Sequence, residues 1–70
     1  MGWGSASGHM NRLIDAMVKH VPDARARRAV YRAMIREFRA GDWDTDGDCI
    51  GRDPAFDAAL RGEDRRRRGR

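Results

Sequence analysis

The sequence predicts an all-α fold: a small three-helix bundle over residues 10–61, with an acidic loop before its third helix and a disordered, arginine-rich tail over residues 62–70. Apolar residues recur with a helical period, and Asn, Asp, Pro and Gly stand where the helices should begin or end. A chain of 70 residues suffices for one small domain. Its apolar runs are far shorter than the roughly 20 residues of a membrane-spanning helix, so we expect no membrane span.

Residues 1–9 are expected to lie outside this domain, as a tag and linker. They are rich in Gly and Ser and contain no Lys, Arg, Asp or Glu, and Gly8-His9-Met10 resembles a cloning scar. The helical domain is therefore expected to begin at Met10.

The first helix is predicted from about Arg12 to His20, with Asn11 as its N-cap. Pro22 disfavours helical backbone at the residue before it, so the helix should stop there. The apolar stripe of this helix consists of Leu13, Ile14, Met17, Val18 and Val21.

The second helix is predicted from about Ala24 to Ala40, between a capping Asp23 and a terminating Gly41. Its expected inner face consists of Ala26, Val30, Ala33, Met34 and Phe38, flanked by Tyr31 and Ile35.

The third helix is expected to begin at Pro54, which suits the first helical position, after a capping Asp53. Gly62 should end it, and the highly charged residues 62–70 cannot bury apolar surface, so we expect them to be disordered. The inner face of this helix consists of Phe56, Ala59 and Leu60, and Trp43 and Ile50 from the loop should close the core.

The acidic loop, residues 42–53, has the spacing of a calcium-binding loop: Asp42, Asp44, Asp46, Gly47 and Asp53 match its positions 1, 3, 5, 6 and 12. This segment resembles an EF-hand. The resemblance implies Ca²⁺ as a cofactor, bound by Asp42, Asp44 and Asp46, by the backbone carbonyl of Asp48, and by Asp53 in place of the usual Glu. EF-hands work in pairs, and a homodimer would supply the second loop. The alternative is a polar connection whose aspartates cap helices and form turns.

Arginines form a second pattern, a stripe opposite the apolar face of the second helix: Arg25, Arg28, Arg32, Arg36 and Arg39. The expected tail adds Arg65, Arg66, Arg67 and Arg68. This pattern is typical of a solvated face, and also of a surface that binds nucleic acid or an acidic partner. Asn and Gln, which read bases, are almost absent.

Catalytic residues are scarce. Cys49 is the single cysteine, which excludes an internal disulfide and fits a cytoplasmic setting. The only nucleophile and base that the predicted domain offers are Cys49 and His20, and nothing in the sequence places them together. We therefore predict a non-catalytic binding or adaptor protein, of bacterial or phage type, that acts through a protein partner. The alternative is a nucleic-acid-binding protein that uses the arginine-rich helix face and tail.

Overall fold

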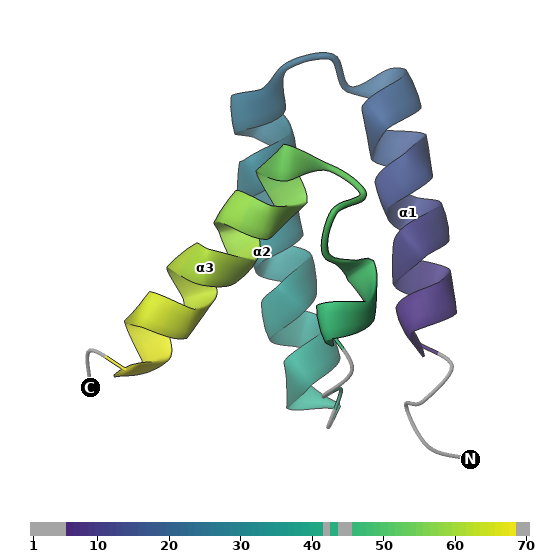
Figure 1. Cartoon of the computed structure of the whole chain (residues 1–70). Coiled ribbons are helices and arrows are strands. Elements are labelled where there is room, and N and C mark those ends of the chain that lie inside the picture. The colour runs from purple at the N-terminus through teal and green to yellow at the C-terminus, as the bar shows by residue number, and fades with distance from the viewer. Residues whose placement is uncertain (1–5, 42, 44–45, 69–70) are drawn as a thin grey trace.

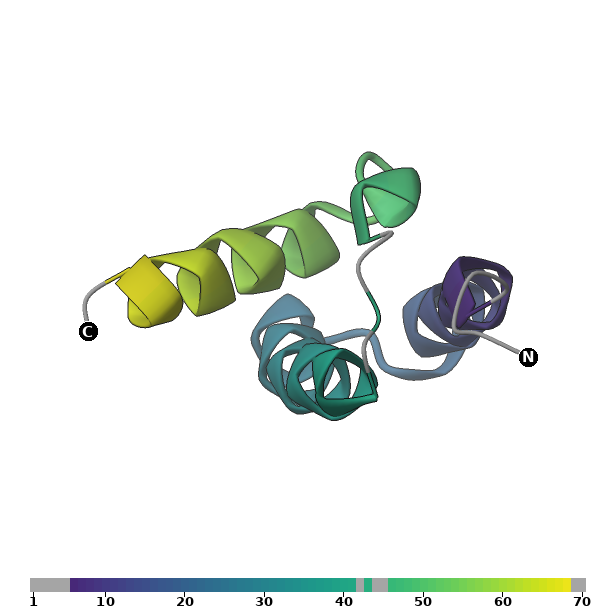
Figure 2. The ribbon, with the colours of Figure 1, turned by 90° about the horizontal axis from the view of Figure 1, so that it is seen from below.

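Two antiparallel helices, α1 (Ala6–His20) and α2 (Ala24–Ala40), form one layer of the fold (Figure 1). The 3-10 helix η2 (Asp46–Cys49) and α3 (Pro54–Arg68) form a second layer upon it (Figure 2). The computed structural model describes residues 6–41, 43 and 46–68, apart from the side chains of residues 67 and 68. Within these ranges all regular structure is helical, which confirms the all-α prediction, and no helix there is both long and apolar enough to cross a membrane.

Aspartates begin the second and third helices as predicted. Asp23 Oδ1 accepts a hydrogen bond from the backbone N–H of Arg25 at 3.0 Å, and Asp53 Oδ1 accepts one from Ala55 at 3.0 Å. These caps satisfy N–H groups that have no partner within the helix. Gly41 stands at the C-cap of α2, so the predicted bounds of that helix are confirmed.

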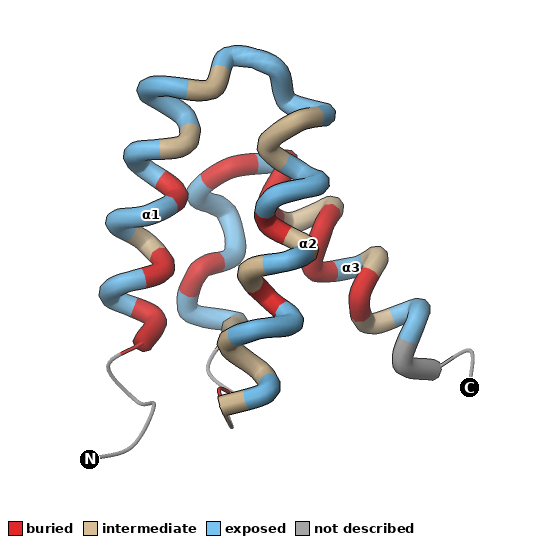
Figure 3. The backbone as a smooth tube through the Cα atoms, turned by 180° about the vertical axis from the view of Figure 1, so that it is seen from behind, coloured by how far each residue is buried: buried red, intermediate tan, exposed pale blue. Residues whose placement is uncertain are grey.

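The core lies between the two layers, where the inward sides of the helices are buried (Figure 3). Two edge-to-face ring pairs link it across the fold: the ring centroids of Tyr31 and Phe56 lie 5.4 Å apart, and those of Phe38 and Trp43 lie 5.3 Å apart. Trp43 closes the core as predicted, whereas Ile50 is 59% exposed and does not. The buried side chains around these rings include Met10, Ile14, Ile35, Cys49, Ala59 and Leu60.

The start of α1 corrects the sequence prediction. The helix begins at Ala6 and not at Arg12, so the expectation that residues 6–9 lie outside the fold is wrong. Ala6 and Met10 are one helical turn apart and both are buried, which extends the apolar stripe towards the N-terminus. Asn11, the predicted cap, therefore lies inside the helix.

Ser7 ties this early turn to the second layer. Its hydroxyl accepts a hydrogen bond from the indole Nε1 of Trp43 at 3.1 Å, and its carbonyl accepts one from the thiol of Cys49 at 3.6 Å. Ser7 itself is buried. The first turn of α1 is thus part of the core, because Ser7 provides hydrogen-bond acceptors for two buried side chains, Trp43 and Cys49.

The buried face of α2 is rotated relative to the prediction. Tyr31 and Ile35, expected as flanking residues, are fully buried, whereas Val30 is 43% exposed and Ala33 is exposed. The rest of the expected inner face, Ala26, Met34 and Phe38, is partly buried. The reason is that α2 packs against the second layer as well as against α1, so its core side turns towards α3 (Figure 2). On α1, likewise, Leu13 and Val18 of the predicted stripe are exposed.

The prediction of a disordered tail is also wrong for residues 62–68. The helix α3 does not stop at Gly62 but continues to Arg68, and Glu63 is only 3% exposed. Composition alone favours disorder here, because the segment has no apolar residue to bury. The segment is held instead by carboxylates at Glu63 and Asp64, which pair with arginines of α2.

Candidate functional site

Glu63 gathers two arginines of the predicted stripe. Its carboxylate accepts hydrogen bonds from Arg36 Nε at 2.9 Å and from Arg32 Nε at 2.8 Å. The hydrogen bond from Arg36, followed by that from Arg32, lowers the pKa of Glu63 from its ordinary 4.5 to about 2 despite its burial. Arg66 lies further away, with Nη1 at 4.0 Å from the same carboxylate. The middle of the stripe is therefore neutralised by α3.

The end of the stripe is neutralised in the same way. Arg39 donates through Nε to Asp46 in η2 at 3.0 Å, and its Nη2 contacts the same carboxylate. Nη2 also donates to Asp64 in α3 at 3.0 Å. One guanidinium group thus joins three helices, although its arginine was predicted to lie on a binding or solvated face.

A further buried ion pair, between Arg27 and Asp53, was not predicted from the sequence. Asp53 Oδ2 accepts hydrogen bonds from Arg27 Nε at 3.0 Å and from the Tyr31 hydroxyl at 2.8 Å, while Arg27 also donates to the carbonyl of Val21 at 2.7 Å. Asp53 is 2% exposed. Burial alone would raise the pKa of its carboxyl, but these hydrogen bonds, with the one from Ala55, outweigh burial and lower it. The sequence contains one indication of this pair. Arg27 precedes Tyr31 by one helical turn and therefore lies on the inner side of α2.

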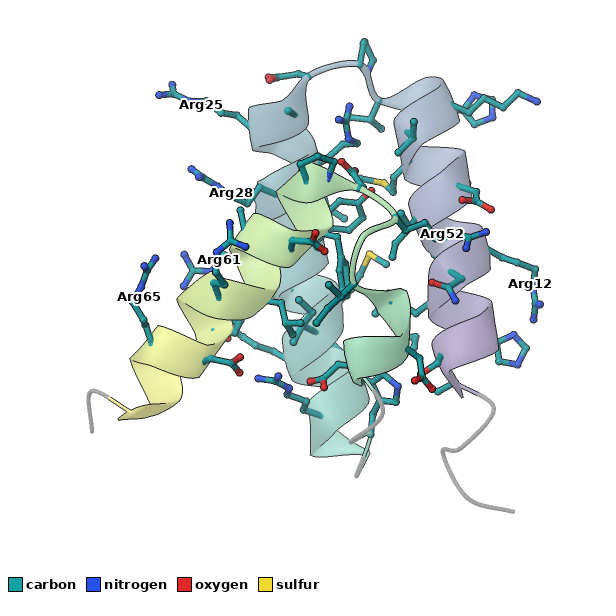
Figure 4. The ribbon with its side chains drawn as sticks, in the orientation of Figure 1. Arg12, Arg25, Arg28, Arg52, Arg61 and Arg65 are labelled. Atoms are coloured by element: carbon teal, nitrogen blue, oxygen red, sulfur yellow. The ribbon has the colours of Figure 1, made fainter. Side chains whose placement is uncertain are left out.

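Four arginines whose side chains the structure describes, two on α2 and two on α3, have no such partners. Arg25 and Arg28 on α2 and Arg61 and Arg65 on α3 are exposed, and none of them forms an ion pair with the described residues. Figure 4 shows these four side chains projecting from the same side of the molecule, away from α1. We call this set of four arginines the basic edge.

Two other labelled arginines lie apart from the basic edge, near α1 (Figure 4). Arg52 binds Asp15 through two hydrogen bonds at 2.8 and 2.9 Å, and Arg12 Nη2 lies 2.7 Å from His9 Nδ1. Of the predicted binding residues, Arg25, Arg28 and Arg65 thus share one free surface, and Arg61 joins them. Arg32, Arg36 and Arg39 are engaged within the fold, and the side chains of Arg67 and Arg68 lie outside the described part.

The predicted calcium ligands are only partly described. Asp42 and Asp44 lie outside the described residues, Asp48 is exposed, and Asp46 and Asp53 bind arginines. Among the described residues there is no group of three His, Cys, Asp or Glu side chains placed to hold a metal ion. Calcium binding by the acidic loop stays a prediction, and it would require Asp46 and Asp53 to exchange an arginine for the metal.

Cys49 and His20 are not brought together. The Cys49 thiol contacts the carbonyl of Ser7, thirteen residues before His20 on the same helix, which is roughly 20 Å at the helical rise per residue. Cys49 is buried, and burial raises the pKa of its thiol, which disfavours the nucleophilic thiolate. His20 is exposed. The two side chains are therefore too far apart to act as a nucleophile and its base, and the thiol is not activated.

The distribution of ion pairs thus defines the candidate site, because it separates the arginines that stabilise the fold from those of the basic edge.

Comparisons of the chain with family models, curated proteins and solved structures found no match.

Proposed function

We propose that this chain is a small, non-catalytic binding protein that docks onto an anionic macromolecule through the basic edge. The observation that carries the proposal is the contrast between the arginines of α2 that are neutralised by α3 or η2 and the four exposed arginines that are not. Like charges gathered on one surface repel one another, and an anionic partner relieves that repulsion.

The spacing of the edge suits a partner that carries a row of negative groups. Arg25 and Arg28 are three residues apart on α2, and Arg61 and Arg65 are four residues apart on α3, so each pair shares one side of its helix. Each guanidinium group can donate two parallel hydrogen bonds to a carboxylate or phosphate. Because the edge spans two helices held together by Glu63, its geometry depends on the fold and not only on net charge.

Chromatography on immobilised heparin, a generic polyanion, tests this proposal. We expect the double variant Arg28→Gln/Arg61→Gln to elute at clearly lower salt than the wild-type chain, since two of the four edge charges are lost. The matched control is Arg12→Gln/Lys19→Gln, which removes the same net charge from exposed positions on α1. We expect this control to elute close to the wild type.

Equal losses in the two variants would contradict the proposal, because binding would then follow net charge and not the basic edge. Failure of the wild-type chain to bind heparin at low salt would contradict it as well. Far-ultraviolet circular dichroism of both variants verifies that the helices are retained.

A further inference from the structure

We infer that the partner of the basic edge is the phosphodiester backbone of a nucleic acid, bound without recognition of the bases. This inference rests on the proposed function and specifies its ligand. It is based on the four arginines of the basic edge, on the absence of an apolar centre there, and on the hydrogen bonds that engage the neighbouring carboxylates.

The edge lacks the apolar centre of a protein–protein interface. Such interfaces generally have a desolvated core of apolar and aromatic side chains within a polar rim. Among the described residues, the large exposed hydrophobic side chains are Leu13, Val18, Val30 and Ile50, and none of them lies on α3. At about 100° per residue, Val30 lies about 160° around α2 from Arg28, on the opposite side of that helix. A phosphate backbone needs no such apolar centre, because charge supplies most of its affinity.

Acidic side chains near the edge are occupied elsewhere. Asp23 accepts from the backbone of Arg25, Asp57 accepts from the backbone N–H of Gly51, and Asp64 binds Arg39. Glu63 of α3 is buried and binds Arg32 and Arg36 of α2. The guanidinium groups of the edge are therefore left to an external anion.

The two helices that carry the edge also lack the usual neutral base-reading side chains. Neither α2 nor α3 contains Asn, Gln, Ser or Thr. Contacts to phosphates position a protein on nucleic acid but carry no sequence information. Binding should thus be independent of sequence and strongly dependent on salt.

The far end of α3 favours access of a long polyanion. In Figure 1, α3 runs obliquely away from α1 towards its C-terminus, and only its inward side, through Glu63 and Asp64, is bonded to α2. Arg65 lies in this diverging part (Figure 4). A nucleic-acid backbone can follow the edge from α2 onto α3 without meeting α1.

Fluorescence anisotropy with labelled probes tests the inference. The probes are two 20-base-pair DNA duplexes of unrelated sequence and a labelled poly-glutamate of similar charge, each titrated with the full chain between 50 and 200 mM salt. We expect equal affinity for the two duplexes and weaker binding of poly-glutamate. With four phosphate contacts, the affinity for DNA should fall about 100-fold over this salt range. In Arg28→Gln/Arg61→Gln, the slope of log affinity against log salt should be about half that of the wild type, whereas Arg12→Gln/Lys19→Gln should keep the wild-type slope.

The outcomes separate the inference from the proposed function. Tighter binding of poly-glutamate than of DNA would overturn the nucleic-acid inference and leave docking onto an anionic partner intact. Strong preference for one duplex would overturn binding without base recognition. Absence of binding to all three probes would overturn both the inference and the proposed function.

Discussion

Replacing Asp53 with asparagine is expected to lower the free energy of unfolding by about 3 kcal/mol, because it breaks a buried ion pair. Asparagine can still cap α3 by accepting from Ala55, so the variant removes the charge and keeps the cap. Arg27, whose side chain is only 14% exposed, is then left with a buried cation and no counterion. For a chain of 70 residues, whose total stability is on the order of 4–10 kcal/mol, this is a substantial fraction. Urea denaturation followed by circular dichroism measures the loss.

A double-mutant cycle assigns that loss to the ion pair. If the pair itself is responsible, adding Arg27→Met to Asp53→Asn should cost much less than Arg27→Met alone costs in the wild-type chain, because the two side chains interact directly. A loss below about 1 kcal/mol for Asp53→Asn, or strict additivity in the cycle, would contradict the role assigned to this pair.

Replacing Glu63 with glutamine should destabilise the fold by about 2 kcal/mol at neutral pH. Two charge-assisted hydrogen bonds are weakened, but Arg32 and Arg36 are partly exposed and can turn to water, which limits the cost. The matched control is Asp64→Asn, in an ion pair whose carboxylate is 45% exposed, and its cost should stay below about 1 kcal/mol.

The stability difference between the wild type and Glu63→Gln should depend on pH, and the pKa of Glu63 determines the direction of that dependence. The pKa of Glu63 is about 2 in the folded chain and has its ordinary value of 4.5 when the chain unfolds. The stabilisation is therefore fully present above the unfolded value and is lost as the pH falls towards 2. Melting temperatures of the wild type and Glu63→Gln should thus differ most above pH 5 and converge near pH 2. A difference that does not change with pH would contradict the ion-pair explanation.

The sequence predicted those parts of the fold that local chemistry determines. The bounds of α2 were predictable because Asp23 and Gly41 act on the helix that they adjoin. The role of Asp53 as the cap of α3 was predictable for the same reason. The fold class followed from the helical period of the apolar residues.

The parts that the sequence did not predict depend on contacts between distant segments. The side of α2 that is buried is set by α3, which packs beside Tyr31, and no local pattern reveals that choice. The order of residues 62–68 depends on Glu63 reaching Arg32 and Arg36, about 30 positions earlier in the chain, and composition gives no hint of it.

Only part of the candidate site could be predicted from the sequence. The sequence located the arginines of α2 and of residues 65–68 as a charged surface, but it could not divide them into paired and unpaired groups. That division arises from four carboxylates, those of Asp46, Asp53, Glu63 and Asp64, which only the folded chain brings to α2.

The measurement that tests this division most directly is the nuclear magnetic resonance spectrum of the arginine Nε–Hε groups near neutral pH. Hydrogen bonding to a carboxylate should slow exchange of Hε with water for the paired arginines, which are Arg27, Arg32, Arg36 and Arg39. The Hε signals of the basic edge, Arg25, Arg28, Arg61 and Arg65, should be broadened by rapid exchange. If Arg32 and Arg36 exchange as fast as Arg25 and Arg28, or if the edge signals are protected in the free chain, the account is contradicted.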